Sequence, residues 1–148
     1  MFSGSSCSNG WVAFGKSCFY VIDIPTLEEN AARRNCQKLG GRLPKITSAA
    51  ENQFIYDLIN GQKKTTRAGA WLGLQRRADM KFYWADGTPL AGYTAWYPGE
   101  PNSRTDSCVH IFGKADSRRG KWNDLACTLQ DAEISYAPVV VCQKHYAQ

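Results

Sequence analysis

The sequence EPNSRTDSC occupies residues 100–108, and the sequence WNDLAC occupies residues 122–127. Each segment ends at a cysteine, so a disulfide between Cys108 and Cys127 would hold the two segments side by side. Together they supply five carboxylate or amide side chains: Glu100, Asn102, Asp106, Asn123 and Asp124. Calcium prefers oxygen ligands, whereas zinc sites commonly use thiolate or imidazole. The two segments therefore predict a site for one hard cation.

Six cysteines in a chain of 148 residues indicate disulfide bonds. The length suits one compact domain, residues 1–148. The cysteines form no CxxC pair and have no histidine partner at zinc spacing, so we expect a disulfide framework made in an oxidising compartment. The spacing alone leaves the pairing open.

Residues 1–6 show no basic segment followed by an apolar run, so we interpret Met1 as the expression start of a mature, secreted and extracellular chain.

Charge and motif content exclude several classes of function. The net charge is +5, and its basic pairs are dispersed along the chain. They indicate solvated surface charge and match no nucleic-acid-binding motif, although weak attraction to anionic glycans or membranes stays open. The longest apolar stretches, such as residues 137–142, are too short to span a bilayer. No nucleophile elbow, HExxH helix or phosphate-binding glycine loop is present, so we expect no enzyme and no catalytic residue.

The first half of the chain predicts a hairpin followed by two helices. Aromatic-rich residues 10–14 and 18–21 flank a glycine turn and predict two strands. Thr26 with Glu29, and Ser48 with Glu51, have the spacing of capping boxes. They predict helices over residues 27–39 and 49–60, each followed by glycine.

The second half predicts strands and long loops. Short apolar runs are separated by Gly, Pro, Asp and Asn, and they predict strands over residues 70–74, 82–84, 109–112 and 137–143. A hairpin, two helices and then antiparallel strands indicate an α+β fold.

Four motifs in this order, with the cysteine spacing, identify a family resemblance. The first two are Trp71-Leu72-Gly73-Leu74 and Trp84-Ala85-Asp86-Gly87, and the others are Glu100-Pro101-Asn102 and Trp122-Asn123-Asp124. Over nearly the whole chain this pattern resembles the carbohydrate-recognition domain of the C-type lectins. The resemblance implies a C-type lectin-like fold, with two helices packed on antiparallel sheets and a long calcium-binding loop. It also implies three disulfides: Cys7–Cys18, Cys36–Cys142 and Cys108–Cys127.

The same resemblance implies the roles of the site residues. One calcium ion would be held by Glu100, Asn102, Asp106, Asn123 and Asp124, with a cis peptide bond before Pro101. Many family members have glutamate where this chain has Asp106. Sugar hydroxyls would contact Glu100, Asn102, Asp106 and Asn123, and Trp96 is a candidate stacking platform, with a loop anchor as the alternative. Positions that bind further ions in many members hold no carboxylate here: Arg76, Met80, Ser103 and Ser107.

Calcium-dependent binding of terminal sugars on cell or microbial surfaces is the function that the resemblance implies. In the family, Glu-Pro-Asn usually accompanies mannose-type sugars. Galactose remains an alternative if the sugar turns over on the ion and meets an aromatic ring. Another class is a calcium-independent member that binds protein, ice or mineral, but such domains usually lose the acids that this chain keeps. Because all six cysteines would pair internally, any homo-oligomer is expected to be non-covalent.

Overall fold

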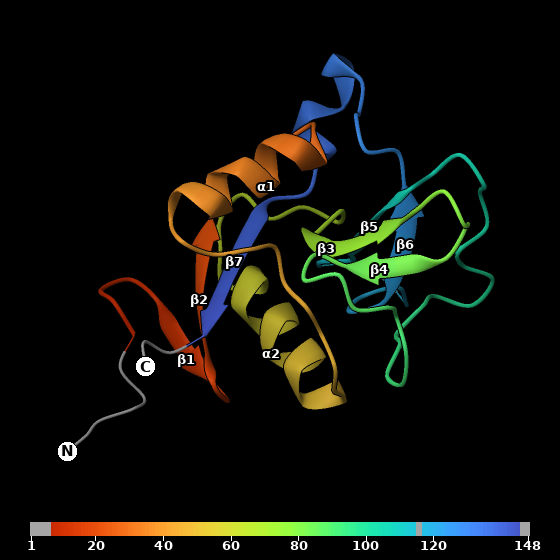
Figure 1. Cartoon of the computed structure of the whole chain (residues 1–148). Coiled ribbons are helices and arrows are strands. Elements are labelled where there is room, and N and C mark those ends of the chain that lie inside the picture. Colours follow the sequence, from red (N-terminus) through yellow and green to blue (C-terminus); the bar gives the residue numbers. More distant parts are fainter. Residues whose placement is uncertain (1–6, 115–116, 146–148) are drawn as a thin grey trace.

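Two antiparallel sheets and two helices make up the computed structural model (Figure 1), which describes residues 7–114 and 117–145. Residues 1–6, in which we found no leader pattern, lie outside the described ranges. One sheet has the strand order β1-β2-β7, and the other has the order β4-β3-β5-β6. Figure 1 shows the long connection from β4 to β5, in green to teal, on the side of the second sheet away from the helices. The α+β arrangement of two helices and antiparallel sheets is therefore as predicted.

The first sheet joins the two ends of the described chain. β1 (Val12–Phe14) and β2 (Ser17–Ile22) form the predicted hairpin around Gly15, which has a φ of 59°. β2 pairs along its whole length with β7 (Val140–His145). Cys7–Cys18 and Cys36–Cys142 are both disulfides, as the family pairing implied.

Helix α1 (Glu29–Lys38) begins later than predicted and without the expected capping box. Its N-cap is Glu28, which makes no side-chain cap hydrogen bond. The Thr26 hydroxyl donates instead to the carbonyl of Ile24. The Glu29 carboxylate is buried and accepts from Arg33 at 2.6 Å. An ion pair within the helix, between positions i and i+4, therefore uses the side chain that the capping pattern assigned to the cap.

Helix α2 (Ala49–Asn60) has the predicted bounds. The Ser48 hydroxyl accepts from the Glu51 N–H at 3.1 Å, which is the expected N-cap. The Glu51 carboxylate accepts from the N–H of Thr47 rather than from that of Ser48. In the described ranges, no helix is long and apolar enough to cross a membrane.

The second sheet carries the candidate site. It contains β3 (Ala70–Arg76), β4 (Phe82–Trp84), β5 (Cys108–Ile111) and β6 (Trp122–Leu125). The short strand β6 and the 3-10 helix η1 (Asp131–Tyr136) were not among the predicted elements. The disulfide Cys108–Cys127 connects β5 to the segment after β6, as implied by the family.

Gly73 lets β3 lie directly against the segment between the two helices. A Cβ atom at Gly73 would meet the Leu43 carbonyl oxygen at 2.6 Å and the Pro44 carbonyl oxygen at 3.0 Å. The Gly73 N–H donates to the Pro44 carbonyl at 2.8 Å. Only glycine fits this close approach, which accounts for its place in the Trp-Leu-Gly-Leu motif.

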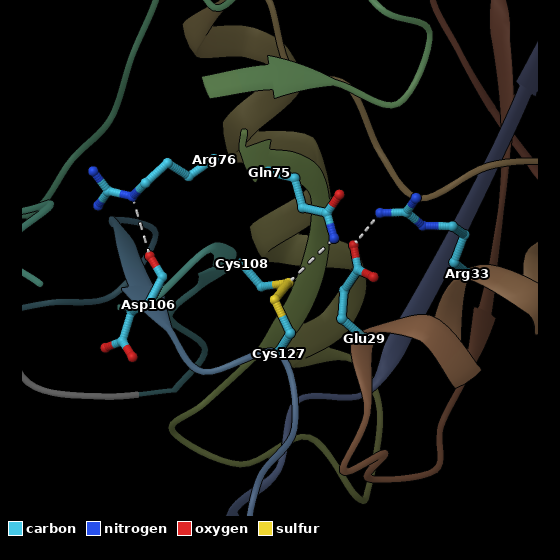
Figure 2. Close-up of a disulfide and its surroundings, with 7 residues drawn as sticks. All are labelled: Glu29, Arg33, Gln75, Arg76, Asp106, Cys108 and Cys127. Carbon is cyan, nitrogen blue, oxygen red and sulfur yellow. Dashed lines mark hydrogen bonds and ion pairs between the residues drawn. A yellow bond between two sulfur atoms is a disulfide. The ribbon is translucent and has the colours of Figure 1, made fainter. Parts of the chain in front are cut away.

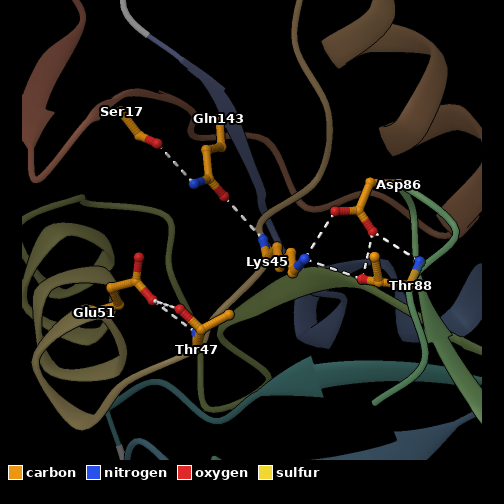
Figure 3. Close-up of polar contacts among 7 residues, drawn as sticks. All are labelled: Ser17, Lys45, Thr47, Glu51, Asp86, Thr88 and Gln143. Carbon is orange, nitrogen blue, oxygen red and sulfur yellow. Dashed lines mark hydrogen bonds and ion pairs between the residues drawn. The ribbon is translucent and has the colours of Figure 1, made fainter. Parts of the chain in front are cut away.

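Lys45 fixes the turn after β4 (Figure 3). Its ammonium donates to Asp86 at 2.8 Å and to Thr88 at 3.0 Å, and its backbone N–H donates to the Gln143 side chain of β7. Partial burial opposes ionisation of Asp86, but hydrogen bonds from Lys45 and Thr88 hold the pKa of this carboxyl well below its usual range. The turn is thereby tied to the first sheet.

Trp122 lies at the centre of the core and connects α2 to β6. Its ring is fully buried and lies edge-on to Trp84, with centroids 5.8 Å apart. The indole N–H donates to the Asn52 side-chain oxygen at 2.8 Å, and the Asn52 amide donates to the Gly120 carbonyl at 2.7 Å. One buried asparagine thus satisfies the indole N–H of Trp122 at the start of β6 and the Gly120 carbonyl in the segment that leads into this strand.

We predict that Asn52→Leu destabilises the fold by on the order of 3 kcal/mol, because the Trp122 N–H and the Gly120 carbonyl lose their partner in the core. Urea unfolding measures the change. The matched control is Gln53→Leu, at an exposed position on the same helix, where a change within about 0.5 kcal/mol is expected. Equal stability of the two variants would contradict the structural role of Asn52.

Candidate functional site

Asp124 on β6 is the centre of the candidate site. Its side chain is fully buried, and its two carboxylate oxygens hold the loop that precedes β5. One oxygen accepts from the Asn102 N–H at 3.2 Å, and the other accepts from the Ser103 N–H at 3.0 Å. The Arg76 guanidinium lies 3.5 Å from the second oxygen. The carboxylate therefore fixes the backbone of the Glu-Pro-Asn segment.

The two carboxylate oxygens of Glu100 have different surroundings. The Glu100–Pro101 peptide bond is cis, as the resemblance implied. Oε2 of Glu100 accepts from the Asn102 side-chain amide at 3.2 Å. Oε1 is buried, and no hydrogen-bond partner is found for it among the described residues. A buried carboxylate oxygen is unfavourable unless a proton or a cation neutralises it, so this atom fits the requirement for a bound ion.

Negative charge is concentrated where the loop meets β6. Burial and the neighbouring Asp124 raise the pKa of Glu100. Burial and Asp124 also raise the pKa of Asp106, and Arg76 partly opposes this rise. Carboxylates that hinder each other's ionisation in this way are stabilised by a cation. The donor set consists of carboxylate and amide oxygens, which suits calcium.

Asn123 faces His110 on the neighbouring strand. The two residues are direct cross-strand partners of β5 and β6. Nδ1 of His110 lies 2.5 Å from the Ala68 carbonyl, which can only accept, so Nδ1 carries the proton. Burial lowers the pKa of His110 to about 4, and the ring is neutral at pH 7. Nε2 therefore accepts from the Asn123 amide nitrogen at 3.3 Å, and the Asn123 oxygen points away from His110.

The structure brings the five predicted ligands together to different degrees. Glu100, Asn102 and Asp124 share one hydrogen-bond network. Asp106 is joined through its backbone carbonyl, which accepts from Arg76, while its carboxylate points away from that arginine (Figure 2). The Asn123 side chain bonds to His110 instead. In the described part of the chain, no three Asp, Glu, His or Cys side chains gather as a ready-made metal group.

Two residues of this site were not identified as members from the sequence. Arg76 was noted only because it is not a carboxylate, and no motif in the sequence pointed to a role for His110. The structure places both in contact with predicted ligands. Their contacts join different strands and loops, so no local pattern signals them.

Trp96 packs inward. Its half-buried ring lies against Phe82, with centroids 5.2 Å apart, and edge-on to Trp122 at 5.8 Å. This is the placement of a loop anchor, the alternative to a stacking platform.

Comparison with known proteins identifies the family. The family model of the lectin C-type domain matches residues 26–134. The chain therefore belongs to the C-type lectin domain family. It is 33% identical over 141 residues to the low affinity immunoglobulin epsilon Fc receptor of Mus musculus, covering 93% of this chain and 37% of the receptor. The chain thus spans little more than a third of that relative.

Solved structures share the fold over almost the whole chain. The cow C-type carbohydrate-recognition domain of CD23, in the presence of GlcNAc2Man3 oligosaccharide, has a TM-score of 0.77 and 29% sequence identity, covering 97% of this chain and 99% of that chain. A calcium-independent type II antifreeze protein has a TM-score of 0.75 and 28% identity, covering 96% of both chains. The family thus includes a calcium-independent member of closely similar shape.

We predict that His110 is protonated only on Nδ1 at pH 7, because the Ala68 carbonyl requires a donor there. Two-bond ¹H–¹⁵N correlation spectra distinguish the two neutral tautomers directly. The exposed His145 is the internal control, and its ring is expected to average between tautomers. A proton on Nε2 of His110 would reverse the Asn123 amide and contradict the arrangement described above.

Proposed function

We propose that this protein binds carbohydrate in a calcium-dependent manner at the loop held by Asp124. The observation that carries the proposal is Oε1 of Glu100, which is buried and has no hydrogen-bond partner among the described residues, while the negative charges of Asp124 and Asp106 help to raise the pKa of this carboxyl. One calcium ion would be held by Glu100, Asn102, Asp106, Asn123 and Asp124. Membership of the C-type lectin family supports a binding protein with no catalytic residue.

The ligand chemistry follows from the polar groups around the ion site. A bound calcium supplies open coordination positions that two neighbouring sugar hydroxyls can fill. Each hydroxyl has one proton and two lone pairs. The carboxylates of Glu100 and Asp106 would accept hydrogen bonds from those hydroxyls, and the amide nitrogens of Asn102 and Asn123 each keep a second N–H for a sugar oxygen. A vicinal diol satisfies these donors and acceptors together.

We infer a preference for mannose-type sugars over galactose. Glu100-Pro101-Asn102 has the order that accompanies mannose-type ligands in the family. The cow CD23 domain, studied with a mannose-containing oligosaccharide, supports this choice. A galactose site with a stacking ring is less favoured because the Trp96 ring packs against Phe82 and Trp122.

The proposed setting is extracellular. Three disulfides support secretion into an oxidising compartment. A single diol site in water is expected to bind at about millimolar strength. Several sites in a non-covalent homo-oligomer would raise the avidity for glycans on a cell or microbial surface.

A calcium-independent binding domain is the second candidate. The specific observation in its favour is the Arg76 guanidinium, which already provides positive charge beside Asp124. The similar calcium-independent antifreeze protein supports this alternative at the level of the family.

Affinity chromatography separates these candidates. Retention on mannose-agarose with calcium and elution by EDTA is the expected result. Retention on galactose-agarose under the same conditions would reverse the sugar preference. Binding that survives EDTA would favour the calcium-independent candidate, and no calcium-dependent retention across a broad glycan array would refute the proposal.

We predict that Glu100→Gln weakens calcium binding by about tenfold or more, because the variant loses the charge of an ion ligand. Isothermal titration calorimetry measures the affinity. Glu28→Gln is the control, since Glu28 is exposed and its side chain makes no cap hydrogen bond. Unchanged affinity in Glu100→Gln would remove this carboxylate from the proposed site.

The wild-type stoichiometry is expected to be one calcium per chain. Arg76, Met80, Ser103 and Ser107 offer no carboxylate for a further ion. The same calorimetric titration gives this number, and a value near two would contradict the prediction.

A further inference from the structure

Arg76 at the end of β3 reaches into the group of acidic side chains. Its side chain is only 11% exposed. Nη2 donates to the Ser103 carbonyl at 2.9 Å and lies 3.5 Å from the Asp124 carboxylate. Nε donates to the Asp106 carbonyl at 3.4 Å, as Figure 2 shows. The guanidinium therefore connects residues 103 and 106 of the loop to β6.

The backbone and the ring below the guanidinium fix its position. The Arg76 N–H donates to the Ser107 carbonyl at 2.8 Å. The guanidinium carbon lies 4.6 Å from the centroid of the buried Phe82 ring. A planar cation on an aromatic face, with its N–H groups directed at oxygens, is a favourable arrangement for arginine. Arg76 therefore occupies a built position rather than a solvent-exposed one.

The positive charge of Arg76 lowers the net negative charge of the site. Glu100, Asp106 and Asp124 together carry a charge of −3 when ionised, and Arg76 reduces the net charge to −2. Without Arg76, the carboxylates of Glu100 and Asp106 on the loop and of Asp124 on β6 would repel one another. This repulsion would push the loop away from β6. With Arg76, a single divalent cation brings the group to neutrality.

We propose that the forked guanidinium of Arg76 acts as an internal cation that holds residues 100–107 against β6 in the absence of metal. Arg76 is a positioning residue in this inference. The loop is then ordered before any ion arrives, and calcium binding does not have to order it. The effect on loop order stands without calcium, whereas its benefit to calcium binding rests on the proposed function.

Arg77 provides a closely matched control. Its guanidinium also lies 4.6 Å from an aromatic centroid, that of Tyr83, but the residue is exposed. Among the described residues it makes no hydrogen bond, ion pair or ring contact with residues 100–107. The variants Arg76→Met and Arg77→Met therefore remove the same charge from adjacent positions, and only the first removes the loop contacts.

Hydrogen exchange in EDTA tests the inference. The reporters are the amides of Asn102 and Ser103, which donate to Asp124. We expect these amides to exchange at least about tenfold faster in Arg76→Met than in the wild type, with Arg77→Met unchanged. The core amides of Leu72 and Leu74 should stay protected in all three proteins. Wild-type exchange of the loop amides in a folded Arg76→Met protein would overturn the inference.

A second variant covers failure of Arg76→Met to fold. Arg76→Lys keeps the charge but loses the fork that contacts Ser103, Asp106 and Asp124 together. Faster loop exchange than in the wild type supports the inference, and wild-type exchange overturns it.

A parallel experiment with calcium separates the two proposals. If calcium restores protection of the loop amides in Arg76→Met, the proposed function is supported. If neither the wild type nor any variant binds calcium, the proposed function is refuted. The exchange rates in EDTA would still decide the role of Arg76.

Discussion

The carboxylate of Asp124 is the interaction on which the candidate site depends. β6 places Trp122 and Asp124 two residues apart, so their side chains are on the same face of the strand. Trp122 is bonded to Asn52 in the core, and Asp124 accepts two backbone N–H groups from the loop. The position of the loop is therefore set by the packing of a buried tryptophan. The candidate site is therefore anchored to the core through backbone N–H groups of the loop.

Local signals in the sequence predicted the elements that form through local interactions. α2 has an N-cap at Ser48 and an apolar stripe, and its bounds were predicted correctly. At α1 the same type of signal failed, because the Glu29 carboxylate accepts from Arg33 one turn further along the helix and the N-cap residue Glu28 makes no side-chain cap hydrogen bond. β6 was not predicted as a strand, since it has only four residues, two of them polar, and its existence depends on pairing with β5.

In the candidate site, too, the sequence did not predict contacts between residues that are far apart in the chain. Motif order was enough to predict five polar side chains near two cysteines, and the structure links Glu100, Asn102 and Asp124 directly. The contacts of Arg76 with Ser103, Asp106 and Asp124 span 27, 30 and 48 residues of sequence. Contacts of that range are fixed by sheet pairing and loop path, which no short motif encodes. The roles of the five ligands stay predictions.

β3 connects distant parts of the molecule through two residues only three positions apart. Gly73 lies against the carbonyls of Leu43 and Pro44, and Arg76 extends into the group around Asp124. A displacement of β3 by a larger side chain at Gly73 would carry the guanidinium with it. Inherited or engineered variants that abolish ligand recognition are therefore expected in the molecule's interior as well as at its rim, and a survey restricted to surface positions would overlook them.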